Sequence, residues 1–184
     1  MAESDILLQA KPAWPPRLLL TGPPQCGKTT VVHRVVEAFP GRAAGFYTRE
    51  VRERGRRVGF EIVTLGGDKA WLSHVDFPGP WRVGKYGVNL DNLHRVALPA
   101  MAPAPGIDLF VIDEIGKMEC LSRRFIEAME RLWAAEMPLL VTVAAKGGGY
   151  IQQIKEKPDA LLITVTPGNR DGLPGRILEL LRSG

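Results

Sequence analysis

Gly22–Thr29, which reads Gly-Pro-Pro-Gln-Cys-Gly-Lys-Thr, is the segment that decides the fold of this chain. It matches the pattern G-x-x-x-x-G-K-[ST] at every fixed position, and the backbone N–H groups of such a loop surround a phosphate. The flanking sequence agrees, because the apolar run Leu18–Thr21 precedes the loop and valines at helical spacing follow it between Lys28 and Phe39. The segment therefore predicts a strand, a phosphate-binding loop and a helix, in that order.

The loop assigns roles to its residues. Its N–H groups and the positive end of the following helix are expected to face the phosphates. The Lys28 ammonium is expected to reach the β- and γ-phosphates as a catalytic charge, and the Thr29 hydroxyl is expected to bind Mg²⁺. The predicted nucleotide-binding residues of this segment are Gly22, Pro23, Pro24, Gln25, Cys26, Gly27, Lys28, Thr29 and Thr30.

The Cys26 thiol allows two interpretations. A helix N-terminus lowers the pKa of a nearby thiol, which would make Cys26 reactive. The favoured interpretation is that the thiol fills a motif position that tolerates many residue types. Cys26 and Cys120 are the two cysteines of the chain, too few for a disulfide framework, so a reducing compartment, the cytoplasm, is predicted.

A second motif follows the apolar run Leu109–Ile112, which is of the kind expected for a central parallel strand. Asp113 ends this run, where an α/β sheet presents residues to its ligand, and it fits the role of holding Mg²⁺. Glu114 comes next, and its carboxylate is predicted to position or deprotonate the water that attacks the γ-phosphate. The alternative is a solvated acidic turn after a core strand. The phosphate loop upstream favours the catalytic interpretation.

Strands and helices alternate along most of the chain, which predicts an α/β fold with a mostly parallel sheet flanked by helices. In Phe46–Leu65, two β-rich runs around Gly55 predict a β-hairpin inserted after the first helix. Residues 66–90 are rich in Gly and Pro and are predicted to be irregular, apart from a strand over Val83–Val88. The other predicted elements are helices over about 91–101, 122–135 and 174–181, a helix after residue 149, and strands over 139–143 and 160–165.

Length and composition set further limits. A chain of 184 residues with 24 basic and 20 acidic side chains, 20 Gly and 15 Pro is typical of one globular domain, expected over residues 17–184. Residues 1–16 end in a proline-rich stretch and are predicted to be a flexible extension. The longest apolar run, Leu139–Ala145, is far shorter than the roughly 20 residues that a bilayer requires. We expect a monomer that does not enter membranes.

Taken together, the motifs resemble one family. The blocks that carry the resemblance are GPPQCGKTT, GFYTREVRERGRRVGFEIVTLGG, RVGKYGVNLDNLHRVALP, VIDEIGKME and TVTPGNRD. They are similar to the compact nucleoside-triphosphatases of thermophilic microbes, whose animal relatives are called cancer-related nucleoside-triphosphatase. The resemblance implies a RecA-like P-loop NTPase fold with an additional strand in its sheet. It also implies Mg²⁺-dependent hydrolysis of ATP, GTP and other nucleoside triphosphates to the diphosphate and phosphate, with broad base tolerance.

Some functional questions stay open at this level. Asn169, after the last predicted strand, is a candidate contact to the base, in a segment that lacks the Asn-Lys-x-Asp pattern of guanine recognition. Arg123, Arg124 and Arg170 are candidates for an arginine that accelerates hydrolysis. The hairpin arginines, Arg49, Arg52, Arg54, Arg56 and Arg57, allow a grip for a triphosphate or for nucleic acid, the latter as part of a nucleotide-dependent switch. The favoured interpretation is a solvated hairpin, and few aromatic residues are available for stacking on single strands. A small nucleotide or nucleoside kinase is the enzymatic alternative.

Overall fold

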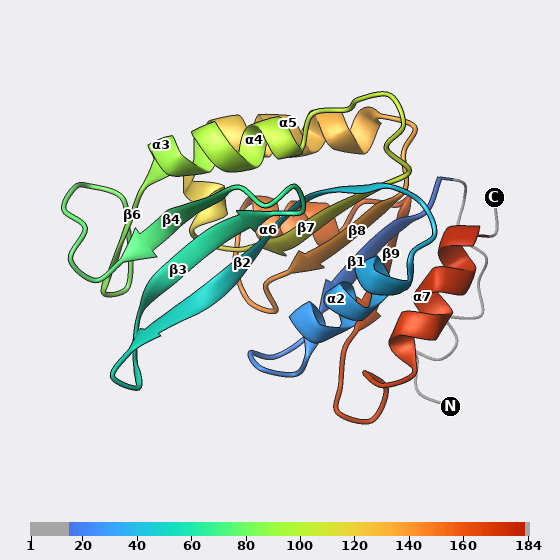
Figure 1. Cartoon of the computed structure of the whole chain (residues 1–184), viewed down its shortest axis with the longest axis horizontal. Coiled ribbons are helices and arrows are strands. Elements are labelled where there is room, and N and C mark those ends of the chain that lie inside the picture. The colour runs from blue at the N-terminus through green and yellow to red at the C-terminus, as the bar shows by residue number, and fades with distance from the viewer. Residues whose placement is uncertain (1–14, 183–184) are drawn as a thin grey trace.

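Nine strands of residues 15–182, the part of the chain that this computed structural model describes, form one mixed sheet with helices on both faces (Figure 1). The strands are β1 (Arg17–Thr21), β2 (Ala43–Glu53), β3 (Arg56–Thr64), β4 (Lys69–His74), β5 (Arg82–Val83), β6 (Tyr86–Val88), β7 (Leu109–Ile115), β8 (Leu139–Val143) and β9 (Ala160–Thr164). Their order across the sheet is β5-β6-β4-β3-β2-β7-β8-β1-β9.

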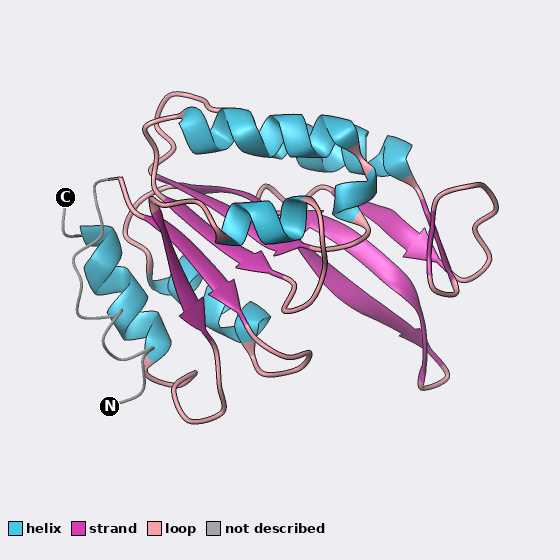
Figure 2. Ribbon diagram, turned by 180° about the vertical axis from the view of Figure 1, so that it is seen from behind, coloured by secondary structure: helices cyan, strands magenta, loops and turns pink. Residues whose placement is uncertain are grey.

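The helices divide between the two faces of the sheet. They are α2 (Lys28–Ala38), α3 (Leu90–Asn92), α4 (Leu98–Ala100), α5 (Arg123–Ala134), α6 (Tyr150–Lys155) and α7 (Leu173–Arg182). Helices α2 and α7 share one apolar cluster with the sheet, and α5, α6 and the α3–α4 segment share the other (Figures 1 and 2). A π-helical turn, Leu93–Ala97, joins α3 to α4. None of the described helices is long and apolar enough to cross a bilayer.

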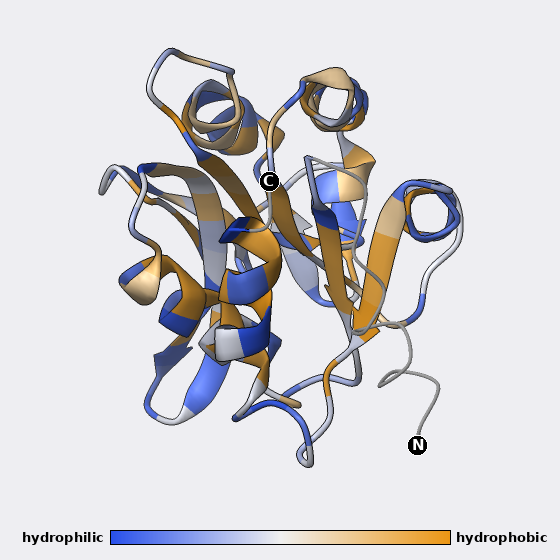
Figure 3. Cartoon of the chain, turned by 90° about the vertical axis from the view of Figure 1, so that its right-hand side faces the viewer, coloured by the Kyte–Doolittle hydropathy of each residue, from blue (hydrophilic) through white to orange (hydrophobic). Residues whose placement is uncertain are grey.

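Strand β1 shows how the sheet is buried on both faces. Leu18 and Leu20 belong to the cluster with α2 and α7, whereas Leu19 belongs to the cluster with α5. All three side chains are fully buried, so β1 needs the continuous apolar run that the sequence contains. Figure 3 shows the same arrangement in hydropathy, with hydrophobic strands inside and hydrophilic residues on the outer sides of the helices.

The sheet has a parallel half and an antiparallel half. Strands β2, β7, β8, β1 and β9 are parallel neighbours, and β8 lies between β7 and the β1 strand that leads into the phosphate loop. This position of β8 confirms the additional strand. Strands β3, β4, β6 and β5 extend the sheet in antiparallel order beyond β2. The predicted hairpin, β2–β3, is thus built into the main sheet, since β2 also pairs with β7.

The strands and helices predicted around the two motifs are confirmed, but the prediction for residues 66–90, which lie between the motifs, is wrong. Residues 66–90 were expected to be irregular, yet they contain β4, which pairs with β3. Pairing with a strand already in the sheet outweighs the weak local signal of this Gly- and Pro-rich region. The single strand expected over Val83–Val88 is a small hairpin, because Gly84 turns the chain with a φ of 58°.

Residues 1–14 of the expected N-terminal extension lie outside the described residues. The last two residues of that segment pack against the fold, since the Pro16 carbonyl accepts a hydrogen bond of 2.9 Å from the Leu139 N–H. The Arg17 guanidinium then donates to the Trp133 carbonyl at 2.9 Å. These contacts tie the start of β1 to β8 and to the end of α5.

Candidate active site

The phosphate loop takes a conformation that explains its glycines. Gly22 has a φ of 149° and Gly27 a φ of 109°, both in the region that favours glycine. A Cβ on Gly22 would lie 2.7 Å from the Val165 carbonyl oxygen, so the close approach of β1 and β9 also requires glycine there. Gln25 has a φ of 64° although it carries a side chain, and it is exposed.

The loop forms one wall of a cavity of about 1170 Å³ at the carboxyl ends of the parallel strands. Eight of the nine predicted residues from Gly22 to Thr30 line it, as do Asp113 and Glu114 from β7. The Lys28 ammonium lies between the two motifs: it donates to the Gly22 carbonyl at 3.1 Å, and its Nζ is 3.8 Å from Glu114 Oε2. The structure therefore brings the two predicted motifs together around one space.

Asp113 is almost fully buried at 2% exposure. Its Oδ1 accepts a hydrogen bond from the Thr142 hydroxyl of β8, whereas its Oδ2 has no hydrogen-bond partner among the described residues. Burial raises the pKa of Asp113, and the hydroxyls of Thr142 and Thr29 and the Lys28 charge act in the opposite direction. Mg²⁺ binds oxygen ligands. Asp113 Oδ2, which is buried without a donor in the described part of the chain, and the Thr29 hydroxyl beside Asp113 are two such oxygens. The residues present fit the predicted metal.

Glu114 stands where the regular β7–β8 pairing is interrupted. The register shifts between Ile112 and Ile115, and this stretch also contains a cis peptide bond between Asp113 and Glu114. Burial raises the pKa of Glu114, and the Lys28 ammonium opposes the shift. The Glu114 carboxylate faces the cavity beside Lys28, a position in which it can accept a hydrogen bond from a water molecule.

Cys26 is the one residue of the predicted loop set that does not line the cavity. Its side chain is 5% exposed and packs in the apolar cluster with Leu18 and Val31. The structure thus supports the interpretation of Cys26 as a filling residue. A contribution of Cys26 to nucleotide binding stays a prediction and would come from its backbone.

Asn169 shapes the loop that follows β9. Its side chain accepts a hydrogen bond from the Thr166 N–H and donates one to the Thr164 carbonyl, both at 2.9 Å. It does not line the main cavity, so a direct contact to the base stays a prediction. Arg170 approaches the phosphate loop more closely, since a Cβ on Gly27 would lie 3.1 Å from its Cδ.

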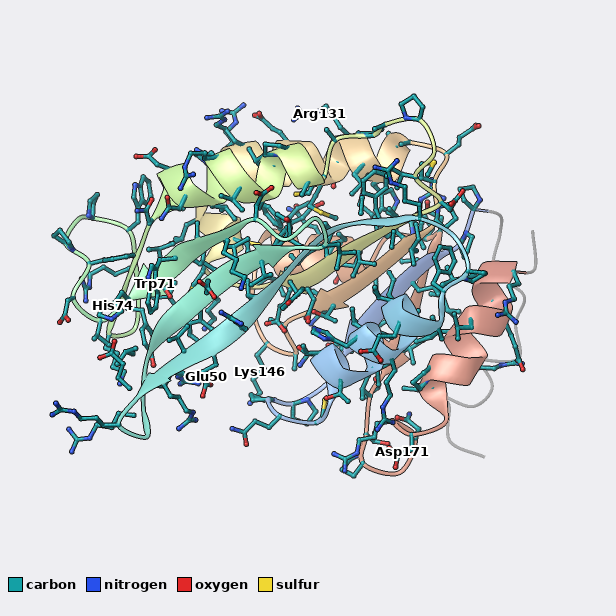
Figure 4. All side chains as sticks on the ribbon, in the orientation of Figure 1. Glu50, Trp71, His74, Arg131, Lys146 and Asp171 are labelled. Carbon is teal, nitrogen blue, oxygen red and sulfur yellow. The ribbon has the colours of Figure 1, made fainter. Side chains whose placement is uncertain are left out.

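Several residues that line the cavity were not found from the sequence. They are Thr48, Glu50 and Phe60 of the hairpin and Lys155 of α6, whereas Arg57 belongs to the arginine cluster that the sequence offers as a candidate triphosphate grip. Alternate residues of a strand share a face, so Thr48 and Glu50 of β2 lie on the same face. That alternation could have identified the two as neighbours in the cavity lining. Figure 4 labels Glu50 and Lys146, both of which line the cavity between the hairpin and the phosphate loop. Lys155 donates to the Ala145 carbonyl at 3.0 Å, a contact across a loop that carries no sequence signal.

Fold and site together define a class of protein. A phosphate loop between β1 and α2, an acidic pair at the end of β7, and β8 between those strands are the architecture of a P-loop NTPase. The family model described as NTPase matches residues 17–178, and the chain belongs to this NTPase family.

Named relatives cover nearly the whole chain. Nucleoside-triphosphatase THEP1 of Thermotoga sp. strain RQ2 is 39% identical, and the match covers 90% of this chain and 95% of the relative. Human cancer-related nucleoside-triphosphatase is 37% identical, with 90% and 96% covered. The crystal structure of THEP1 from Aquifex aeolicus superimposes with a TM-score of 0.83 at 34% identity, covering 90% of this chain and 99% of that one.

Proposed function

We propose that the protein hydrolyses nucleoside triphosphates to the diphosphate and phosphate, in a Mg²⁺-dependent reaction that accepts several bases. The observation that carries the proposal is the position of Glu114, whose carboxylate faces the cavity 3.8 Å from the ammonium of Lys28. An acid beside the lysine that binds the terminal phosphates is suited to hold the attacking water. The relatives named above as nucleoside-triphosphatases support the same activity.

Each residue of the site has a distinct task in this reaction. Glu114 orients a water molecule and accepts its proton as the water oxygen bonds to the γ-phosphorus. The bond from that phosphorus to the β,γ-bridging oxygen breaks, and the Lys28 ammonium stabilises the charge that grows on the leaving diphosphate. Thr29 and Asp113 would hold Mg²⁺, which neutralises phosphate charge when bound. The water and the nucleotide thus yield one diphosphate and one phosphate.

Broad base tolerance is supported by the region beside the phosphate loop. Thr30, Arg34, Arg170 and Asp171 line a small hollow of about 270 Å³ there. Asp171 is the acidic residue of the segment Asn169-Arg170-Asp171. Its Oδ1 lies 3.4 Å from Nη1 of Arg34. This segment at the hollow lacks the Asn-Lys-x-Asp pattern of guanine recognition, which supports tolerance of several bases.

The two alternatives are weaker. Arg49 of the hairpin is paired with Glu61 at 2.5 Å, and Arg52 with Glu50 at 2.5 Å, so much of the basic charge is compensated within the sheet. This compensation disfavours a nucleic-acid grip. A kinase would need a second substrate in the same cavity, and it would release no phosphate without that acceptor.

The test is phosphate release from ATP, GTP, CTP and UTP with Mg²⁺, without acceptor or nucleic acid. Wild type would be compared with Glu114→Gln and with Glu136→Gln, an exposed control outside the cavity. We expect release from all four nucleotides, a fall of about 10²-fold or more in Glu114→Gln, and no change in the control. Tight nucleotide binding without release by wild type would overturn the proposal and favour the kinase.

A further inference from the structure

The β2–β3 hairpin extends past the ends of the parallel strands and stands beside the ligand space. Tyr47 of β2 is paired with Asp113, and β2 then continues as far as Glu53. Ligands of open α/β sheets bind outside the carboxyl ends of the strands. Thr48 and Glu50 of β2 and Arg57 and Phe60 of β3 line the cavity, so this part of the hairpin is a side wall of it. In Figure 1 the hairpin tip and the start of α2 lie at the same end of the sheet.

Only one arginine of this wall lines the cavity. The hairpin arginines are Arg49, Arg52, Arg54, Arg56 and Arg57, and of these Arg57 alone lines it. A β-bulge explains why Arg57 faces the cavity. Val51 pairs with Gly59 and Arg52 pairs with Arg57, so Val58 is an extra, unpaired residue in β3. Strict alternation would put Arg57 and Phe60 on opposite faces, three residues apart, and the bulge returns Arg57 to the face of Phe60.

Hydrogen bonds and ring contacts hold the Arg57 guanidinium on the face of the hairpin that lines the cavity. Its Nε donates to the Tyr86 hydroxyl at 2.8 Å and its Nη1 to Glu50 Oε2 at 2.9 Å. The guanidinium carbon also lies 5.4 Å from the centre of the Phe60 ring and 5.6 Å from that of Tyr86. An arginine carries five N–H donors, so donors remain for an anion in the cavity.

Glu50 would not be left uncompensated if Arg57 turned to a ligand. Arg52 Nε lies 2.5 Å from Glu50 Oε1, the carboxylate oxygen that Arg57 does not use. A carboxylate shared by two arginines can release one of them and keep its counter-charge. The Arg57 side chain is 43% exposed, and a movement toward the cavity would exchange its contacts with Tyr86 and Glu50 for contacts with the ligand.

We propose that Arg57 is the arginine of this site, supplied by the same chain, and that its guanidinium contacts the terminal phosphate of the bound nucleotide. The proposal rests on the proposed triphosphatase function and adds a residue to it. Such an arginine stabilises charge on the phosphate oxygens in the transition state. Tyr86 and Glu50 act as positioning residues that hold the guanidinium on the cavity wall.

The arginines suggested by the sequence are less suited to this role. Arg123 pairs with Glu127 on the surface of α5 and is 90% exposed, and Arg124 approaches His94. Neither lines the cavity. Arg170 lies over Gly27 and lines the small hollow beside the phosphate loop, not the main cavity.

The test compares Arg57→Ala and Arg57→Lys with Arg56→Ala, the exposed neighbour that does not line the cavity. For each variant kcat and KM for ATP, the Kd for ADP, and the Kd for ADP with aluminium fluoride would be measured. We expect Arg57→Ala to lower kcat by about 10-fold or more and to weaken aluminium fluoride binding equally. The Kd for ADP should stay unchanged, Arg57→Lys should recover part of the loss, and Arg56→Ala should match wild type.

Two results would overturn the proposal. One is an unchanged kcat in Arg57→Ala. The other is an equal loss of ADP and ADP–aluminium fluoride binding, which would make Arg57 a support of the hairpin. If wild type itself released no phosphate, the proposed function would fail. The contact of Arg57 with the terminal phosphate would then be tested by binding alone: Arg57→Ala should weaken binding of ATPγS more than binding of ADP, and equal effects on both would overturn it.

Discussion

The Thr142 hydroxyl, near the carboxyl end of β8, donates a hydrogen bond to Oδ1 of Asp113, in β7. Thr142 is fully buried, and its carboxylate partner is 2% exposed. The additional strand of the sheet therefore does more than separate β7 from β1. Its Thr142 hydroxyl binds Oδ1 and leaves Oδ2, the oxygen that we propose for the Mg²⁺ shell, without a hydrogen-bond partner among the described residues.

Thr142→Val removes this hydrogen bond while keeping the shape of the side chain. Asp113 would lose one group that holds its pKa down, since the Thr142 hydroxyl opposes the effect of burial. We expect the Mg²⁺ concentration for half-maximal phosphate release to rise by about 10- to 100-fold. Thr142→Ser keeps the hydroxyl and should resemble wild type. Equal Mg²⁺ dependence in all three proteins would show that the hydrogen bond does not tune the metal site.

Lys28→Ala removes the ammonium that faces both the phosphate loop and Glu114. Turnover should fall by about 10²-fold or more, because the variant loses the ammonium proposed to stabilise the charge that grows at the β,γ-bridge. Steady-state phosphate release measures the effect, and Lys117→Ala, at an exposed position outside the cavity, is the control. Near-normal turnover of Lys28→Ala would remove the phosphate loop from the mechanism.

Glu119 makes stability depend on pH. Burial raises its pKa from 4.5 to about 8, with a further contribution from the Glu114 charge, although the Gly116 N–H donates to its Oε2 at 3.1 Å. The folded state then holds a proton that the unfolded state loses above pH 4.5. The stability from this group is full below pH 4.5 and is lost as the pH rises toward 8.

Glu119→Gln should remove this pH dependence, since the amide is neutral at all pH values and its oxygen can still accept from Gly116. Urea unfolding of both proteins between pH 5 and pH 9 measures the difference. We expect the variant to gain stability relative to wild type as the pH rises, by on the order of a few kcal/mol, at about 1.36 kcal/mol per pKa unit. A constant difference across this range would mean that Glu119 ionises freely in the folded protein.

Both cysteines should react slowly in the native protein. Cys26 is buried in the core, and burial raises the pKa of the half-buried Cys120 to about 12. Thiolate is the reactive form, so labelling by iodoacetamide at pH 7.5 should follow the rate of unfolding. Cys26→Ala and Cys120→Ala identify which thiol is labelled. Rapid modification of Cys26 in the folded protein would revive the interpretation of a reactive thiol at the helix N-terminus.

The two motifs were predictable because each is a short run of sequence between strongly patterned elements. The phosphate loop follows an apolar strand directly, and Asp113 and Glu114 end another. Parallel strands present their carboxyl ends on one edge, so the meeting of Lys28 with Glu114 followed from the predicted topology. The helix and strand predictions next to these motifs hold for the same reason.

The antiparallel half and the far wall of the cavity depend on contacts that no local pattern encodes. Strand β4 forms through pairing with β3, and its sequence lies among glycines and prolines that favour loops. The position of Arg57 depends on the bulge at Val58, and one extra residue exchanges the two faces of a strand. Lys155 reaches the cavity through the packing of α6 after a glycine-rich loop.

Strand β2 belongs to both halves of the sheet, with β7 on one side and β3 on the other. Truncation of the chain to its phosphate-binding half by deleting residues 54–88 would turn this interior strand into an exposed edge. An edge of that kind offers unpaired N–H and C=O groups to the edges of other molecules and promotes aggregation. A shortened version of the protein would therefore need charged or proline substitutions along β2 to remain in solution as separate molecules.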